Sequence, residues 1–221
     1  IEIIKKRKGV IEAMATHIIT QSPDRVAPRE MHWLASAAWQ HLAFEAELKH
    51  KREIAAETYR KLGRLEVDAS SLQIETDGRQ YGYRNKIEFT FTPRPDGQIS
   101  LAFFNRGGRS RMSVTESLLA EPVINTVAQE LLAWIQQEKI PMRSLKTMIV
   151  RSDGAGQTLA GLFIKDELAF SSYPKLTSEL IGLDLYFSKY NSPASVPTKL
   201  LYHVGADTLT TNILGQPLRY G

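Results

Sequence analysis

The chain has 221 residues, 43% of them hydrophobic, which is enough for a packed core in one large domain or two smaller ones. Its net charge of +4 is small, so only a local cluster of cations would mark a surface for polyanions. No cysteine occurs, which excludes disulfides, thiolate metal sites and a cysteine nucleophile within these residues. No apolar run approaches the roughly 20 residues that span a bilayer, and we expect a cytoplasmic protein without a membrane partner.

Two β-strands are predicted in residues 1–20, separated by Gly9 and followed by a turn-rich segment at 21–30. Two strands rarely stand alone, so we expect them to belong to a larger sheet or barrel. The first strand carries four consecutive cations, Lys5, Lys6, Arg7 and Lys8.

A long helix is predicted from about Ala38 to Leu62, because this interval contains no Gly or Pro and Gly63 follows it. Its apolar residues recur at spacings of three, four and seven, which gives one stripe that we expect to pack on a neighbouring domain or sheet. The stripe consists of Phe44, Leu48, Ala55, Tyr59 and Leu62.

The pattern changes to period two from about residue 70, which predicts a domain boundary near 63–71. Alternating apolar residues in 87–91 and 99–103, with turn chemistry between them, predict a β-hairpin. Pro122 begins a second helix with a stripe of Ile124, Val127, Leu131 and Ile135.

The remaining segments predict more strands, and we expect an α+β domain with a mostly antiparallel central sheet. A hairpin is expected at 146–166, a short helix at 173–182, strands at 183–191 and 199–205, and a strand with a turn at 207–221.

The common catalytic motifs are absent, since no HExxH, GxSxG or P-loop pattern occurs. The glycines of 154–157 lie inside a predicted hairpin and indicate a β-turn rather than a phosphate cradle. The histidines lack metal-ligand spacing, which favours structural or capping roles for His32 and His41.

Cations beside aromatic residues are the stronger lead, because cations hold phosphates and exposed rings stack on unpaired bases. Three segments have this character: 81–86, 103–111, and 39–41 with the downstream 49–52. In each, the alternative is that the rings pack within the fold. The first two lie at the start and end of one hairpin, so a single edge is able to present both.

The candidate residues fall into two groups. RNA-binding candidates are Lys5, Lys6, Arg7, Lys8, Tyr83, Arg84, Asn85, Lys86, Arg106, Arg109 and Arg111. Interface or positioning candidates are Trp39, Gln40 and His41.

Five segments resemble, in order and spacing, the RNA (uracil-5-)-methyltransferase family, which makes 5-methyluridine in transfer and ribosomal RNA. They are SPDRVAP, WQHLAFEAELKHKREIAAETYRKLG, YGYRNKIEFTF, LAFFNRGGRSRMSVTESLLAEPVINTVAQEL and LGQPLRYG. The resemblance covers essentially the whole chain, and the pattern QHLxxExxLxxK followed by GYRNK is fairly specific.

The resemblance implies three domains: an oligonucleotide-binding-like TRAM barrel, a central α+β RNA-contacting domain, and a Rossmann-like methyltransferase domain that binds S-adenosylmethionine. Residues 1–22 then correspond to the last barrel strands, 23–65 to a linker and long helix, and 66–221 to the central domain. We expect the methyltransferase domain to be absent from this chain, which begins with Ile and reads as a piece of a longer protein. The cofactor site, the cysteine that attacks uracil C6 and the general base would lie in that domain. The 221 residues are therefore expected to contain no catalytic, cofactor-binding or metal-binding residue and to be inactive alone.

Many family members hold a four-iron cluster through cysteines. The expected ligand positions fall near Leu34, Ala37 and Ser117, and the first two cannot ligate iron. The resemblance implies a cluster-free branch, in which Trp33, Leu34 and Trp39 fill the volume by packing.

The sequence favours the substrate-RNA-positioning portion of an S-adenosylmethionine-dependent RNA uracil-C5 methyltransferase, acting on transfer or 23S ribosomal RNA. In it, Arg84 and Lys86 neutralise phosphates, Asn85 donates to phosphate or base edges, and Tyr83 stacks or packs. Alternatively, Arg84 and Asn85 brace the interface to the missing domain. Two other classes stay open: a non-catalytic RNA-binding protein on the same scaffold, and a protein-interaction domain with negligible RNA affinity.

Overall fold

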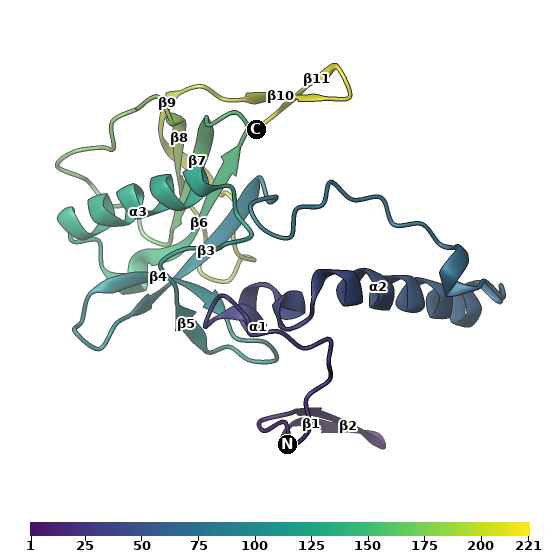
Figure 1. The fold of residues 1–221 in the computed structure, drawn as a ribbon. Helices are drawn as coiled ribbons and strands as arrows, with labels where there is room; N and C mark the ends of the chain where they lie inside the picture. The colour runs from purple at the N-terminus through teal and green to yellow at the C-terminus, as the bar shows by residue number, and fades with distance from the viewer. The chain divides into compact units, whose positions relative to one another are not determined.

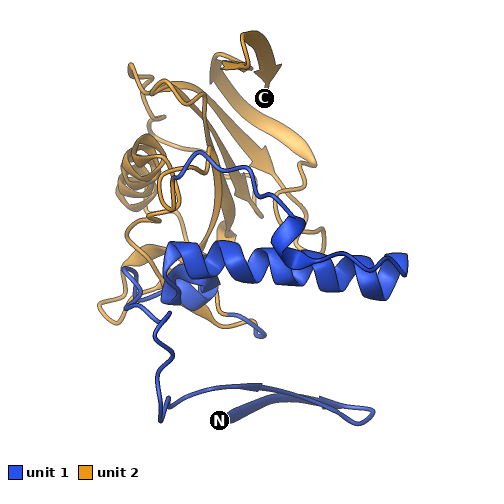
Figure 2. Ribbon diagram, turned by 45° about the vertical axis from the view of Figure 1, so that its right-hand side comes forward, with its two compact units in different colours: residues 1–78, 106–108 blue, residues 79–105, 109–221 orange.

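The computed structural model describes all 221 residues and divides into two compact units. Unit 1 comprises residues 1–78 and 106–108, and unit 2 comprises residues 79–105 and 109–221 (Figure 2).

Unit 1 begins with an antiparallel hairpin of β1 (Glu2–Arg7) and β2 (Val10–Met14). The chain turns at Lys8 and Gly9, which both have positive φ angles of 42° and 81°. The predicted strand pair is therefore confirmed. The two strands form a sheet of their own and leave apolar side chains such as Val10 and Ile11 exposed.

The predicted single helix over 38–62 is wrong at its start. The chain forms α1 (Trp33–Ser36), the 3₁₀ turn η1 (Ala38–His41), α2 (Phe44–Thr58), the π-helical turn η2 (Tyr59–Gly63) and the 3₁₀ turn η3 (Ala69–Ser71). Leu42 is extended because it forms a β-bridge with Arg25, and the Ala43 N–H donates to the Asp24 carbonyl at 2.8 Å. Pairing with a distant segment thus overrides local helix propensity.

The apolar stripe of α2 is only half-buried at Phe44, Leu48 and Ala55. Tyr59 and Leu62, in the π-helical turn, are 48% and 83% exposed. The expected packing of the stripe on a neighbouring domain or sheet is therefore not seen at this turn and stays a prediction there.

Unit 2 is built on a seven-stranded sheet in the order β5-β4-β3-β6-β7-β8-β9. Neighbouring strands are antiparallel except for the parallel pair β7–β8, so the predicted mostly antiparallel sheet and both predicted hairpins are confirmed. The strands are β3 (Lys86–Pro93), β4 (Ile99–Phe104), β5 (Arg111–Ser113), β6 (Leu145–Ser152), β7 (Thr158–Ile164), β8 (Leu180–Phe187) and β9 (Lys199–Gly205). A 3₁₀ turn, η4 (Met142–Ser144), precedes β6, and a separate hairpin of β10 (Leu209–Ile213) and β11 (Gln216–Tyr220) follows the sheet.

The helix α3 (Pro122–Gln137) lies across one face of this sheet (Figure 1). All four residues of its predicted stripe are at most 1% exposed. They share one core with the residues of β3 and β6 that point to the same side: Ile87, Phe89, Phe91, Met148 and Val150. Pro122 lies in the first helical turn, where its missing N–H has no cost.

The predicted short helix over 173–182 is wrong. The Thr177 hydroxyl accepts the N–H groups of Glu179 and Leu180, at 3.2 and 2.9 Å, which makes a turn instead. Tyr173 stacks on Tyr202 of β9 with ring centroids 3.8 Å apart, so this segment is held against the sheet.

Replacing Leu131 with Ala should lower the free energy of unfolding by about 2–5 kcal/mol, because the side chain is 1% exposed and its loss leaves a cavity under α3. Urea denaturation measures this change. The neighbouring substitution Glu130→Ala is the control, since Glu130 is exposed and should stay within about 0.5 kcal/mol. Equal effects of the two substitutions would contradict the packing described here.

Candidate nucleic-acid interface

The GYRNK segment enters the sheet with its backbone fully engaged. The Arg84 N–H donates to the Leu119 carbonyl at 2.8 Å, and the Arg84 carbonyl accepts from the Glu121 N–H at 3.0 Å. The Asn85 carbonyl accepts from the Ser152 N–H at 2.8 Å. These bonds tie the segment to the loop before α3 and to the end of β6.

The side chains of this segment are nevertheless exposed. Tyr83 is 44% exposed, and Arg84, Asn85 and Lys86 are exposed as well. Neither Arg84 nor Lys86 makes an ion pair within the structure. A fixed backbone with free cationic head groups is the arrangement that binding a phosphate backbone requires.

Arg151 joins this group although the sequence did not single it out. In the β3–β6 register, Arg151 lies directly opposite Lys86, and its guanidinium makes no ion pair or hydrogen bond. The alternation of residues 146–152 indicates that Arg151 points away from the core, because Met148 and Val150 point toward it. Finding it required the strand register, which is a long-range property.

The other cations of the predicted hairpin cluster lie elsewhere. Arg111 is on the edge strand β5, where its guanidinium lies 5.2 Å from the Phe104 ring centroid and donates to the Phe91 carbonyl at 3.2 Å. Arg109 is exposed in the preceding loop. Arg106 belongs to unit 1, in which Gly107 lies against Ile4. The structure therefore brings Lys86 together with Arg151 rather than with Arg111.

The four cations of the N-terminal hairpin are all exposed. Lys5, Arg7 and Lys8 line a shallow depression of about 370 Å³ together with Val10 and Glu12. This surface is consistent with a polyanion contact, and it is a separate feature of unit 1.

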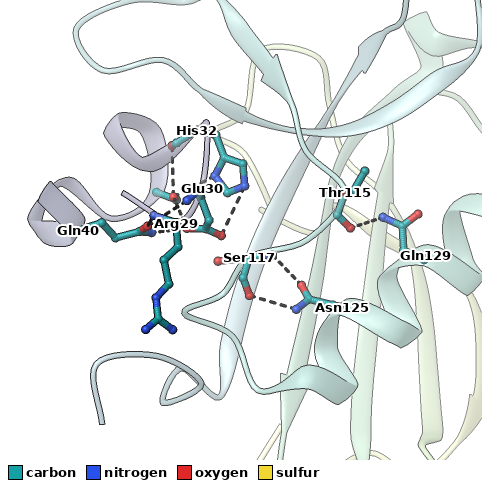
Figure 3. Close-up of polar contacts among 9 residues, drawn as sticks. Arg29, Glu30, His32, Gln40, Thr115, Ser117, Asn125 and Gln129 are labelled. Atoms are coloured by element: carbon teal, nitrogen blue, oxygen red, sulfur yellow. Dashed lines mark hydrogen bonds and ion pairs between the residues drawn. The ribbon is translucent and has the colours of Figure 1, made fainter. Parts of the chain in front are cut away.

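Gln40 has a structural role in unit 1 (Figure 3). It is 3% exposed, its Nε2 donates to Oε2 of Glu30, and its Oε1 accepts the N–H groups of Arg29 and Glu30 at 3.2 and 3.3 Å. His32 Nδ1 lies 3.0 Å from the Ser36 hydroxyl, and its Nε2 lies 3.5 Å from Glu30 Oε1. We call Glu30, His32, Ser36 and Gln40 the buried polar network.

The neighbouring candidates also pack within the fold. His41 Nδ1 lies 2.5 Å from the Ala38 carbonyl, and its ring centroid lies 5.1 Å from that of Trp33. Lys51 lies over the Trp39 ring at 5.8 Å. The side chains of this segment thus stabilise a loop whose backbone has little regular structure.

The residues near the expected iron-ligand positions do not fit an iron–sulfur cluster. Leu34 and Ala37 have no ligating atom, and Ser117 has a hydroxyl in place of a thiolate. Ser117 is 1% exposed, and its hydroxyl has no hydrogen-bond partner. Its backbone is held by Asn125 of α3, which pairs with the Ser117 N–H and carbonyl at 2.9 and 3.0 Å (Figure 3).

The residues of 154–157 do not fit a cofactor cradle either. They form the turn between β6 and β7, and Asp153 closes it by accepting the N–H groups of Ala155 and Gln157 at 2.8 and 3.0 Å. These N–H groups are therefore occupied. No three His, Asp or Glu side chains converge in a way that could hold a metal ion. None of the helices has the length and apolar character of a membrane crossing.

A hydrogen-bonded cluster lies on the face of the sheet away from α3. Asp184 accepts from the Tyr186 hydroxyl and from His203 Nδ1, both at 2.8 Å, and His203 Nε2 lies 3.4 Å from Asp207. The hydrogen bond to Asp184 raises the pKa of His203 above its ordinary range. Burial, together with the Asp184 carboxylate, raises the pKa of Tyr186 to about 12.

Sequence comparison relates the chain to RNA methyltransferases. An uncharacterized RNA methyltransferase of Porphyromonas gingivalis is 22% identical, with 100% of this chain and 55% of that protein covered. One of Bdellovibrio bacteriovorus is 26% identical, with 95% and 52% covered. The 23S rRNA (uracil(1939)-C(5))-methyltransferase RlmD of Halomonas elongata is 26% identical, with 82% and 37% covered. No protein-family model matches the chain.

Structure comparison finds the same fold in the tRNA (uracil-54, C5)-methyltransferase of Pyrococcus abyssi, solved in complex with S-adenosyl-L-homocysteine. The TM-score is 0.70 at 17% sequence identity, and the match covers 97% of this chain and 50% of that one. The chain thus spans about half the length of this protein and of the first two relatives.

Over nearly all of its length, the chain is similar to proteins named RNA methyltransferases. Two of the matched proteins act on uracil C5 by name. The predicted resemblance to the RNA (uracil-5-)-methyltransferase family is therefore confirmed.

Replacing Gln40 with Leu should destabilise unit 1 by about 1–3 kcal/mol, because it removes the acceptor of two backbone N–H groups and one of the hydrogen-bond donors to the buried Glu30 carboxylate. Hydrogen exchange should become faster throughout residues 24–43. The substitution Gln73→Leu, at an exposed position of the same unit, is the control. Unchanged exchange in the Gln40 variant would show that the buried polar network does not hold this loop.

An NMR titration of His203 should give a pKa above 6.5, and Asp184→Asn should lower it. Because the folded-state pKa is raised, the pair stabilises the fold fully below the unfolded pKa, and this contribution is lost as pH rises through the folded pKa. Asp207→Asn removes the same charge from a weaker contact and should have a smaller effect. Identical shifts in both variants would contradict a dominant hydrogen bond to Asp184.

Proposed function

We propose that the chain is the substrate-RNA-positioning portion of an S-adenosylmethionine-dependent RNA uracil-C5 methyltransferase. The observation that carries the proposal is the match of nearly the whole chain to about half the length of proteins named RNA methyltransferases. The uracil-C5 names of two matched proteins, and the S-adenosyl-L-homocysteine bound to one of them, support the reaction and the cofactor.

RNA binding is assigned to this chain and methyl transfer to another domain, because these residues lack the groups that methyl transfer needs. Covalent attack on uracil C6 needs a thiolate, and the chain contains no cysteine. In its glycine-rich turn, Asp153 accepts the N–H groups of Ala155 and Gln157 and the Ser152 hydroxyl accepts that of Gly154, so these groups are not available to a cofactor. The 221 residues therefore contribute binding and orientation of RNA, and methyl transfer belongs to a methyltransferase domain outside them.

The start of β3 is the proposed RNA contact in unit 2. Arg84 and Lys86 are exposed cations without ion-pair partners on a backbone that is hydrogen-bonded at both flanks. A rigid backbone lowers the entropy cost of placing the two charges on successive phosphates. Tyr83, 44% exposed, is placed to stack on an unpaired base. In unit 1, the exposed cations Lys5, Lys6, Arg7 and Lys8 are a separate candidate RNA contact, as the last strands of a TRAM-like barrel would offer.

A non-catalytic RNA-binding protein on this scaffold is the second candidate. It is favoured by the absence of cysteine in a chain that keeps exposed cations at the start of β3. The two candidates share the RNA contact and differ in whether the protein that contains this chain makes 5-methyluridine.

The double substitution Arg84→Ala/Lys86→Ala should weaken binding of the chain to transfer or 23S ribosomal RNA. It should also make the slope of log K against log salt concentration about 1.4–1.8 less negative, since two phosphate contacts are lost. Fluorescence anisotropy over a salt series measures both quantities.

The control variant is Arg143→Ala/Lys175→Ala, which removes two exposed cations from other parts of unit 2. It should leave the slope near the wild-type value. A slope that both variants change equally would assign RNA binding to net charge rather than to the start of β3. Absence of RNA binding by the wild-type chain at low salt would favour a protein-interaction domain.

A further inference from the structure

The sheet of unit 2 has a second face that no helix of this unit covers. Strand residues that alternate with the core residues point to this second face. The strand registers place them side by side in rows that cross the strands. One row runs through Lys86, Arg151, Leu159 and Gly182. The next row runs through Glu88, Ile149, Gly161, Asp184 and His203.

The first row begins with two like charges side by side. Like charges directly opposite each other on adjacent strands destabilise a sheet, and a carboxylate nearby usually relieves the repulsion. Glu88, the next residue of β3 on this face, instead accepts a hydrogen bond from the Ser195 hydroxyl at 2.7 Å. Neither Lys86 nor Arg151 makes an ion pair with Glu88 or with another carboxylate, so an RNA phosphate between them would neutralise their charges.

A groove of about 200 Å³ lies next to this pair, and Arg151 forms part of its wall. Its lining includes Gly161, where an added Cβ would lie no closer than 3.4 Å to the nearest side chain, and Gly182, which the Ala206 carbonyl and the Leu159 side chain approach closely. Phe163 and Tyr186 also line it, and their rings stack with centroids 5.1 Å apart at 25°. The volume is below the roughly 300 Å³ of the smallest typical small-molecule pockets, and it suits one flat ring better than a whole cofactor.

The far end of the groove carries the opposite charge. Asp184 and Asp207 both line it. Asp184 is engaged by Tyr186 and His203, whereas the Asp207 side chain is 80% exposed and has one contact, with His203. A carboxylate repels phosphate and accepts hydrogen bonds from ring N–H groups, so the two ends favour one orientation of a nucleotide: phosphate at Arg151, base toward Asp207.

We propose that this face is a subsite for one nucleotide of single-stranded RNA. Lys86 and Arg151 bind its phosphate, and its base enters the groove over Gly161, against the Phe163–Tyr186 stack. The subsite rests on the proposed RNA-positioning function and deepens it by adding Arg151, Gly161 and the aromatic pair.

The phosphate half is tested with Arg151→Ala and a fluorescein-labelled decauridylate in the 221-residue chain. Loss of one phosphate contact should make the salt slope about 0.7 less negative. Arg143→Ala, at the other end of β6, removes the same charge and should leave the slope unchanged. Arg151→Gln keeps most of the side-chain length and replaces Arg151→Ala in this measurement if the Ala variant does not fold.

The base half is tested with Gly161→Ala. The added methyl group would lie 3.4 Å from the Phe163 ring and 3.9 Å from the Tyr186 ring, so it fits without displacing them and occupies the groove. Affinity for decauridylate should fall about fivefold, as expected for part of one stacking contact. Binding of a decamer with abasic sugars, and the salt slope, should not change.

Three outcomes separate the possibilities. Wild-type binding of decauridylate with the predicted losses in both variants supports the subsite. The subsite is overturned if the wild-type chain binds but Arg151→Ala and Arg143→Ala have the same salt slope. It is also overturned if Gly161→Ala binds decauridylate with wild-type affinity. Either result leaves the proposed function standing. No binding of any RNA by the wild-type chain at low salt overturns both.

Discussion

The packing of α3 on one side only of the seven-stranded sheet is the constraint on which the rest of unit 2 depends. The helix stripe buries Ile124, Val127, Leu131 and Ile135 against one face, and each such side chain contributes about 1.5–3 kcal/mol when fully buried. Because strand residues alternate between the two faces, the residues that pack on α3 also determine which side chains point to the opposite face. Shifting a strand by one residue would bury Lys86 and Arg151 and expose Phe89 and Met148, which holds the register firmly.

The same constraint explains how exposed cations are held in a rigid position. The GYRNK backbone is tied to the loop before α3 and to β6, so the packing of that helix also fixes the start of β3. Arg84, Lys86 and Arg151 therefore have fixed attachment points while their head groups stay free. This suits the RNA-positioning function proposed above.

Sequence periodicity was sufficient to predict the helices and strands in which the local pattern agrees with the tertiary structure. The hairpins β3–β4 and β6–β7 and the helix α3 follow the predicted alternation and stripe. It failed where distant contacts decide, since Leu42 is extended through its bridge to Arg25 and Tyr173 stacks on Tyr202. At 173–180 a local signal was also missed, because the Thr177 hydroxyl accepts the N–H groups that follow it and makes a turn.

For the site, the sequence supplied the four exposed residues Tyr83–Lys86 from one contiguous segment. It could not supply Arg151, whose relation to Lys86 exists only through the β3–β6 register. It also missed the buried polar network, because Gln40 and Glu30 are ten residues apart and only the folded loop brings them together. The segment therefore depends on hydrogen bonding as well as on the expected packing of Trp33, Leu34 and Trp39.

Ultraviolet cross-linking of the chain to RNA, followed by peptide mass spectrometry, tests most directly which face of the sheet holds the substrate. Nucleotide adducts are expected in peptides that contain residues 81–86, 158–164 or 182–187. Adducts confined to α3 and 170–175, on the side where Trp134 and Tyr173 lie, would contradict this expectation.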